Sequence, residues 1–176
     1  MDYLVTGLPR TRTAWLANLL TYGPSFCSHE LITVAGLDGA LGQLSRLNYK
    51  FKGVADSGAG WCWKRILTKF PDIKVLRITR PWKEAAESHH RYFSDNPIPG
   101  MDSPSLPMTE IICQHLDKEL DAMEKKTNCR TVDFTDLHNE LTCAWIWGWL
   151  VPNEPFNRER WALLDKMRIN LASEKY

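Results

Sequence analysis

The sequence predicts an α/β fold in three layers, with a mostly parallel central sheet of about five strands flanked by helices. Short apolar runs with β character alternate with helical stretches along the chain, which is the pattern of βαβ units. The chain has 176 residues, 44% of them hydrophobic, a usual size and composition for one folded domain. We therefore expect residues 1–176 to form a single domain.

The first half of the chain supplies most of the expected strands and helices. The five expected strands are residues 3–6, 25–28, 51–55, 73–79 and 130–134. The first four are followed by predicted helices at residues 13–22, 37–47, 60–70 and 82–93. Gly23 and Pro24 suit the end of the first helix, and Pro81 suits the start of the fourth. Parallel strands need such crossover helices, so this order favours a parallel sheet.

The second half begins with a proline-rich segment. Residues 94–107 contain four prolines and no apolar periodicity, which predicts a long irregular loop of the kind that often serves as a lid. Apolar side chains then recur at helical spacing and predict a helix over residues 109–126. A helical region rich in Trp is expected to end near residue 173.

The composition excludes several classes of protein. No apolar run approaches the ~20 residues that a membrane-spanning helix needs, and the N-terminus does not resemble a signal peptide. A formal net charge of +1 argues against nucleic-acid binding. The five cysteines are scattered, with no metal-like spacing, so we expect reduced thiols. These features predict a cytoplasmic protein that binds neither membrane nor nucleic acid.

Charge is unevenly distributed along the chain. Residues 46–93 hold eleven Lys or Arg and four Asp or Glu, whereas residues 94–154 hold four and eleven. Two interpretations stay open: the two parts neutralise each other in the fold, or the basic part contributes to a pocket for an anionic ligand.

The segment TGLPRTRTAW, residues 6–15, lies where a phosphate-binding loop occurs, between a predicted strand and a predicted helix. A Walker A loop starting at Gly7 needs glycine, lysine and a hydroxyl residue at positions 12, 13 and 14, where this chain has Arg12, Thr13 and Ala14. The missing hydroxyl matters because that group holds Mg²⁺ in NTPases. The sequence therefore disfavours magnesium-dependent ATP chemistry, and we expect no metal.

The same segment nevertheless suits an anion. The N–H groups and the dipole at the start of a helix attract negative charge. The guanidinium of Arg10 can hold two oxygens of a phosphate or sulfate, and Thr11 and Thr13 can donate further hydrogen bonds. A turn with exposed arginines is the alternative interpretation.

Residues 9–15, PRTRTAW, resemble the PKSGTTW segment of the sulfotransferases that use 3′-phosphoadenosine 5′-phosphosulfate (PAPS). The resemblance implies a fold of the P-loop type in which this segment binds the 5′-phosphosulfate, with Arg10 as the basic residue that contacts the sulfuryl donor. The donor-binding residues that it implies here are Pro9, Arg10, Thr11, Arg12, Thr13 and Trp15. The chain departs from the family pattern where Arg12 replaces a glycine and Ala14 replaces a threonine.

A second segment, at residues 76–93, resembles the family's 3′-phosphate-binding segment. In that family an arginine at the end of a strand is followed eight residues later by a serine on the next helix, and Arg80 and Ser88 have this separation. The spacing is also physically suitable, because open α/β sheets bind ligands at the carboxyl ends of their strands. The resemblance implies that Arg80 and Ser88 hold the 3′-phosphate of PAPS.

Sulfuryl transfer also needs a base that takes the proton of the acceptor. The family supplies a His or Glu just after the third strand, where Asp56 is the only ionisable group of residues 53–58 in this chain. A helix cap is the other role that suits Asp56. His29, followed by Glu30 after the second predicted strand, is the alternative base.

The resemblance implies an enzyme that transfers a sulfuryl group from PAPS to a hydroxyl or amine of a small-molecule, sugar or peptide acceptor. Trp61 and Trp63 suit either an acceptor pocket or core packing. Two other functions stay open: a P-loop kinase of a small molecule, and a non-catalytic nucleotide-binding protein that retains the fold.

Overall fold

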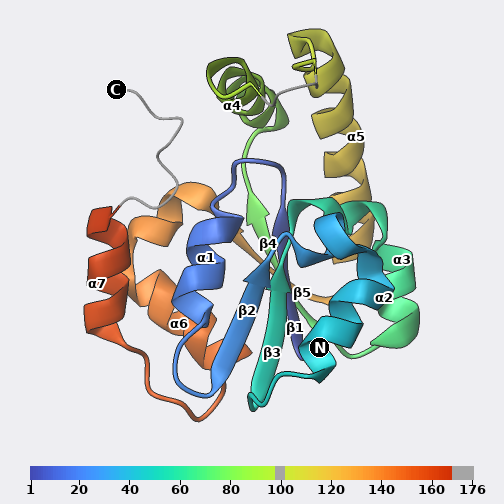
Figure 1. Cartoon of the computed structure of the whole chain (residues 1–176). Coiled ribbons are helices and arrows are strands. Elements are labelled where there is room, and N and C mark those ends of the chain that lie inside the picture. Colours follow the sequence, from blue (N-terminus) through green and yellow to red (C-terminus); the bar gives the residue numbers. More distant parts are fainter. Residues whose placement is uncertain (98–101, 168–176) are drawn as a thin grey trace.

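The computed structural model describes residues 1–97 and 102–167, which build a five-stranded parallel sheet between layers of helices (Figure 1). The strands are β1 (Tyr3–Gly7), β2 (Ser25–His29), β3 (Phe51–Ala55), β4 (Lys74–Thr79) and β5 (Asn128–Asp133). Their order across the sheet is β2-β3-β1-β4-β5, and each neighbouring pair is parallel. The predicted α/β class is therefore confirmed, with every expected strand in its place.

Helices cover both faces of the sheet (Figure 1). On one face lie α1 (Thr13–Leu20), α6 (Glu140–Leu150) and α7 (Arg158–Met167). On the other lie α2 (Leu31–Ser45), α3 (Trp63–Lys69) and α5 (Leu106–Glu124). Beyond the carboxyl ends of the strands stands α4 (Trp82–Asp95), beside the first part of α5. Two short 3₁₀ helices, η1 (Ser57–Trp61) and η2 (Phe134–His138), follow β3 and β5.

Two apolar cores hold the layers together, one on each face of the sheet. Successive side chains of a strand point to opposite faces, so Tyr3 and Val5 of β1 pack with the core under α1 and α6. Leu4, between them, packs with the core under α2, α3 and α5. Because both faces are covered, all residues of β1 are buried, as expected for the central strand of a parallel sheet.

Some helix boundaries differ from the prediction for local reasons. The helix predicted to begin at residue 37 begins at Leu31 instead. Its first turn is separated from the rest by a kink at Gly36, whose φ is 68°. The loop predicted over residues 94–107 is shorter in its described parts, because α4 continues to Asp95 and α5 begins at Leu106. Residues 98–101 of that predicted loop lie outside the described residues.

The Trp-rich region at the end of the chain forms two helices rather than one. Between α6 and α7, Pro152 and Pro155 remove backbone donors and interrupt the helical hydrogen bonding. The predicted end near residue 173 lies outside the described residues. Among the helices that the structure describes, none combines the length and the apolar character needed to cross a membrane.

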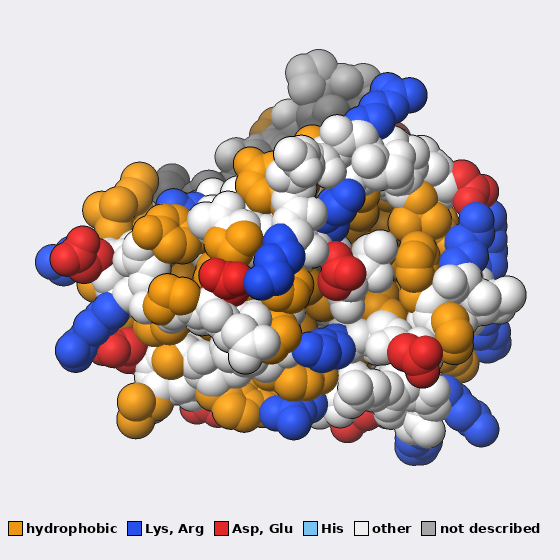
Figure 2. Space-filling model, turned by 90° about the horizontal axis from the view of Figure 1, so that it is seen from below, with side chains coloured by type: hydrophobic (Ala, Val, Ile, Leu, Met, Phe, Trp, Pro, Cys, Tyr) orange, Lys and Arg blue, Asp and Glu red, His pale blue; other side chains and the backbone are white. Residues whose placement is uncertain are grey.

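Part of the uneven charge along the chain is neutralised across β4 and α5. Arg77, on β4, is buried, with only 5% of the residue exposed. It donates to three carboxylates of α5, at 2.8, 2.6 and 2.7 Å: Asp117, Asp121 and Glu124. On the face seen from below, near the amino ends of the strands, basic and acidic side chains are interspersed (Figure 2). Mutual neutralisation therefore accounts for Arg77. Arg80 lies beyond the end of β4, where its Nε is 3.8 Å from a Glu84 carboxylate oxygen.

The packing of β1 against β3 gives a first prediction, for Gly53→Ala. Gly53 pairs with Tyr3, and a Cβ at this position would overlap the buried Tyr3 ring. The ring has little room to move, because its hydroxyl lies 3.0 Å from the Ser25 hydroxyl. We expect the free energy of unfolding in urea to fall by about 1–3 kcal/mol.

Gly42→Ala is the matched control, since a Cβ at this exposed position of α2 would meet nothing within 4 Å. It is expected to stabilise the protein by about 0.5–1 kcal/mol. Equal free energies of unfolding for the two variants would contradict the packing described for Gly53.

Candidate functional site

A cavity of about 660 Å³ lies at the carboxyl edge of the sheet. Its walls come from the loop after β1, the ends of β2 and β4, η1, α4 and α5. From β1 the chain passes through α1 to β2, on one side of β1, whereas from β4 it passes through α4 and α5 to β5, on the other side. The carboxyl ends of the neighbouring strands β1 and β4 are therefore a topological switch point, at which α/β sheets bind ligands. The volume is in the usual range for a small-molecule site.

The loop after β1 owes its path to Gly7 and Thr11. A Cβ on Gly7 would lie 2.5 Å from the Ile78 carbonyl oxygen of β4, so only glycine permits this close approach of the two strands. The Thr11 hydroxyl is buried and donates to the Leu8 carbonyl at 2.7 Å. Thr11 therefore shapes the loop from inside and does not line the cavity.

Arg10 and Arg12 both have left-handed backbone conformations, with φ of 66° and 65°. Such a conformation costs an L-residue roughly 1–2 kcal/mol, whereas glycine adopts it readily. Arg12, the residue before α1, thus keeps the turn that a glycine would make at this position. Both side chains line the cavity, next to the backbone N–H groups at the start of α1.

Aromatic and imidazole groups hold these two guanidinium groups in place. The Arg10 guanidinium lies over the Tyr92 ring of α4, 4.4 Å from its centroid. Arg12 donates a hydrogen bond to Nε2 of His138, at the end of η2. The cavity therefore has two arginines whose side chains are held by contacts from distant parts of the chain.

The second predicted anion-binding segment reaches the same cavity. Arg80 donates a hydrogen bond of 3.0 Å to the Arg10 carbonyl, and its guanidinium lies 4.5 Å from the centroid of the Phe134 ring. Ser88 lines the cavity from α4. The structure thus brings residues 9–13 and residues 80–88 together around one space.

Asp56 has a structural environment and does not line the cavity. Its fully buried carboxylate accepts hydrogen bonds from the Thr33 N–H at 2.9 Å, the Thr33 hydroxyl at 2.6 Å and the Gly58 N–H at 2.9 Å. These bonds cap η1 and tie it to the start of α2. Of the two roles that the sequence left open for Asp56, base and helix cap, these contacts correspond to the helix cap.

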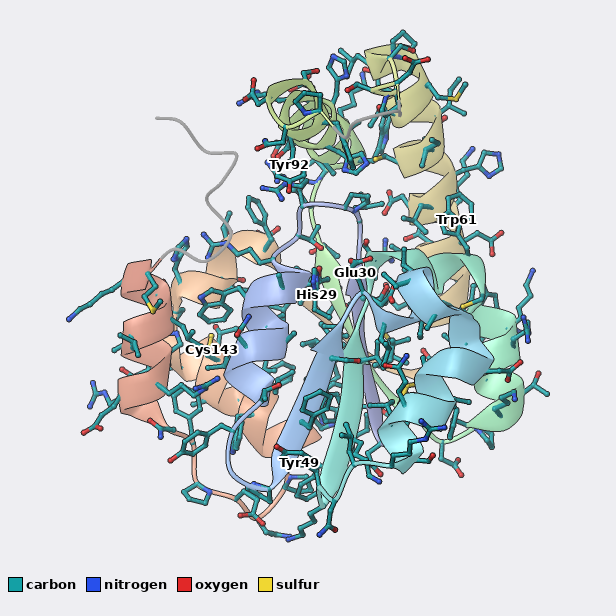
Figure 3. The ribbon with its side chains drawn as sticks, viewed as in Figure 1. His29, Glu30, Tyr49, Trp61, Tyr92 and Cys143 are labelled. Atoms are coloured by element: carbon teal, nitrogen blue, oxygen red, sulfur yellow. The ribbon has the colours of Figure 1, made fainter. Side chains whose placement is uncertain are left out.

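His29 and Glu30 do line the cavity, at the end of β2 (Figure 3). His29 Nε2 lies 3.3 Å from the Thr13 hydroxyl and 3.5 Å from Glu30 Oε1. The same Glu30 oxygen accepts hydrogen bonds from the N–H and hydroxyl of Ser57, at 3.2 and 2.8 Å. Glu30 therefore joins the end of β2 to η1 and places a carboxylate oxygen beside the His29 ring.

Most residues predicted for the site therefore meet in one place. Those that line the cavity are Pro9, Arg10, Arg12, Thr13, His29, Arg80 and Ser88. Those that do not are Thr11, Trp15 and Asp56. Trp15 is 2% exposed and packs in the apolar core between the sheet and α6.

Three residues of α4 that line the cavity, His89, Tyr92 and Phe93, have no role in the prediction from sequence. A usable signal was present, because residues four apart lie on one helix face and Tyr92 follows Ser88 by four positions. For Phe134 and His138, which come from a distant part of the chain, sequence spacing offers no comparable signal.

One side of the cavity, formed by η1 and α5, is largely apolar. Trp61, Ile112 and Leu116 line it, and Figure 3 shows Trp61 beside α5, away from Tyr92. Trp63 is instead buried in the core and donates to Glu119 at 2.7 Å. The structure thus separates the two tryptophans, with Trp61 at the cavity and Trp63 in the packing.

The site residues do not form a metal centre of the usual kind. Within residues 1–97 and 102–167, no group of three or more His, Cys, Asp or Glu side chains is placed to hold a metal ion. The charged groups at the cavity are dominated by arginines, which suit anions.

The partly buried position of His89 predicts a pH dependence of stability. Burial lowers the pKa of His89 below its ordinary value of 6.5, and the nearby charge of Arg10 lowers it further. The unfolded chain therefore binds a proton more readily than the folded protein, so this residue reduces stability as the pH falls through 6.5. In His89→Gln, we expect the free energy of unfolding to fall less steeply between about pH 7 and pH 5. Equal slopes for the variant and the wild type in urea unfolding would contradict this.

Comparison with known proteins identifies the fold. No family model matches the chain, and no curated protein sequence matches it. Among solved structures, the mouse sulfotransferase SULT7A1 complexed with PAP matches with a TM-score of 0.65 and 14% sequence identity, over 94% of this chain. The chain spans 62% of the length of that structure. At this identity the match establishes that the chain shares the α/β fold of a sulfotransferase.

Proposed function

We propose that this chain binds PAPS in the cavity and transfers its sulfuryl group to a hydroxyl or amine of a small acceptor. The observation that carries the proposal is the meeting of Arg10 and Thr13 with Arg80 and Ser88 around one space. The two segments lie 70 residues apart and are joined by the Arg80–Arg10 hydrogen bond. The fold shared with a sulfotransferase that was solved with PAP supports the same function.

The two anionic ends of PAPS have matching positions in this arrangement. Arg10, Arg12 and the N-terminus of α1 suit the 5′-phosphosulfate, because guanidinium groups and helix N–H groups both favour bound anions. Arg80 and Ser88 suit the 3′-phosphate, as the family resemblance implies. A donor held at both ends would be fixed in one orientation, which is what an in-line transfer requires.

In the transfer, the acceptor oxygen or nitrogen forms a bond to sulfur while the bond from sulfur to the 5′-phosphate oxygen breaks. The proton of the acceptor passes to a base, and adenosine 3′,5′-bisphosphate leaves. We assign the base to His29, because it lines the cavity and lies beside the Glu30 carboxylate. Arg10 would stabilise the charge that develops on the departing phosphate.

The apolar side of the cavity is the proposed place of the acceptor. Trp61, Ile112 and Leu116 offer a surface for an aromatic or aliphatic group. A space of about 660 Å³ that also holds the donor favours a small molecule over a sugar chain or a peptide.

Binding of adenosine 3′,5′-bisphosphate tests the donor site. At a concentration of about 100 times its Kd, the nucleotide should raise the free energy of unfolding by about 2.7 kcal/mol in the presence of EDTA. Arg80→Ala should weaken binding about 10-fold to 100-fold, because it removes a charged hydrogen-bond donor. Arg65→Ala, whose guanidinium pairs with Asp38 on the surface, is the control. Stabilisation by magnesium ATP alone would instead favour the kinase interpretation.

Separate substitutions of the two candidate bases, His29 and Asp56, and of the neighbouring Glu30 test the chemistry. His29→Gln should lower kcat by about 10²-fold to 10⁴-fold, since it removes the proton acceptor, and should leave nucleotide binding close to that of the wild type. The assay is the release of adenosine 3′,5′-bisphosphate from PAPS with a panel of phenols, alcohols and amines.

Asp56→Asn should behave differently, because its N–H₂ group would replace one of the two oxygens and face a donor, either the Thr33 N–H or the Gly58 N–H. We expect a loss of about 1–3 kcal/mol in stability and an unchanged kcat for the folded protein. A large loss of kcat in Asp56→Asn at normal stability would return the base to Asp56, and a large loss only in Glu30→Gln would assign it to Glu30. Nucleotide binding without transfer to any acceptor would favour the non-catalytic alternative.

A further inference from the structure

Arg12 is joined to the C-terminal helix of the described chain by two successive hydrogen bonds. Its guanidinium donates to Nε2 of His138 on η2. Nδ1 of the same ring lies 2.8 Å from an Asp165 carboxylate oxygen on α7. The three residues therefore form a chain that begins at the cavity and ends on α7, 153 positions further along the sequence.

The chemistry of the three groups fixes the direction of these bonds. A guanidinium has only N–H donors, so His138 Nε2 is the acceptor of the bond from Arg12. The proton of the neutral ring is then on Nδ1, from which it is donated to the Asp165 carboxylate. Asp165 thus selects the tautomer of His138 that can hold Arg12, as carboxylates do for histidines in many sites.

We propose that His138 and Asp165 are positioning residues that hold the Arg12 guanidinium toward the 5′-phosphosulfate of the donor. The inference rests on the proposed function and extends the donor site to η2 and α7. A guanidinium has five N–H donors, so the bond to His138 is compatible with further bonds to an anion.

The contribution of the two residues would be to reduce the entropy that Arg12 loses when the donor binds. An unrestrained arginine side chain has many rotamers, and ordering it weakens binding. Here the left-handed backbone of Arg12 and the bond to His138 set the side chain before the donor arrives. The effect should therefore be confined to the 5′ end of the nucleotide.

The position of α7 is secured by contacts that do not involve Arg12. Arg160 donates to the Asn18 carbonyl of α1 at 3.1 and 2.6 Å, and Leu164 packs in the apolar core with α1 and α6. Substitution of His138 or Asp165 should therefore leave the helix in place. Arg158, which pairs with Glu140 at 2.9 Å, provides a control on the same helix.

The test compares two nucleotides that each carry one of the phosphates, adenosine 5′-monophosphate and adenosine 3′-monophosphate, with adenosine 3′,5′-bisphosphate as reference. His138→Ala and Asp165→Ala should weaken binding of the 5′-monophosphate and of the bisphosphate by about threefold to tenfold, measured by calorimetry. Binding of the 3′-monophosphate should not change. Arg158→Ala should leave all three affinities as in the wild type.

A rescue variant separates positioning from folding. His138→Gln keeps an oxygen that can accept from Arg12, so it should retain most of the affinity for the 5′-monophosphate that His138→Ala loses. Wild-type affinity for the 5′-monophosphate in His138→Ala, or an equal loss for both monophosphates, would overturn the inference. Failure of the proposed function is distinguishable from these results, because the wild type itself would then not bind the bisphosphate.

Discussion

The hydrogen bond from the Arg80 guanidinium to the Arg10 carbonyl is the interaction on which the candidate site depends. It exists because β1 and β4 are neighbours, with Gly7 next to Ile78, so that the segments leaving both strands start side by side. An absent Cβ at Gly7 allows this approach. The close pairing of Gly7 with Ile78 thus sets the separation of Arg10 and Arg80, the two arginines that would hold the two ends of a doubly anionic ligand.

Conformational strain is concentrated around the same space. Of the four described non-glycine residues with positive φ, three line the cavity: Arg10, Arg12 and Glu30. Such conformations persist only where surrounding contacts enforce them, and they are common at functional sites. Here the Tyr92 ring, the His138 imidazole and the Ser57 hydroxyl supply those contacts. The strain is thus compensated by residues from α4, η2 and η1, three elements that meet only in the folded chain.

The basic residues behind the uneven charge along the sequence have different surroundings. Arg77 and Arg80, which lie within β4 and just after it, are an example. Arg77 lies within β4, where its side chain points to the face covered by the acidic α5. Arg80 lies just beyond the end of the strand, where it lines the cavity. Mutual neutralisation, the first interpretation of the charge pattern, therefore holds for Arg77. The second, a basic pocket for an anionic ligand, remains a prediction for Arg80. Charge counts over long segments could not distinguish these two arginines, because a shift of three positions along the chain is enough to place the side chain in different surroundings.

The sequence by itself determined the order and type of the main elements and indicated the two segments that are predicted to bind anions, since these depend on periodicity and on spacing within a few turns. It left the roles of Asp56 and His29 open, because both follow strands at one edge and differ only in the direction of their side chains. In the tertiary structure, Asp56 caps η1, and His29 lies beside Glu30 at the cavity. It alone placed His138 against Arg12, because that contact joins residues 126 positions apart and exists only after the sheet has formed.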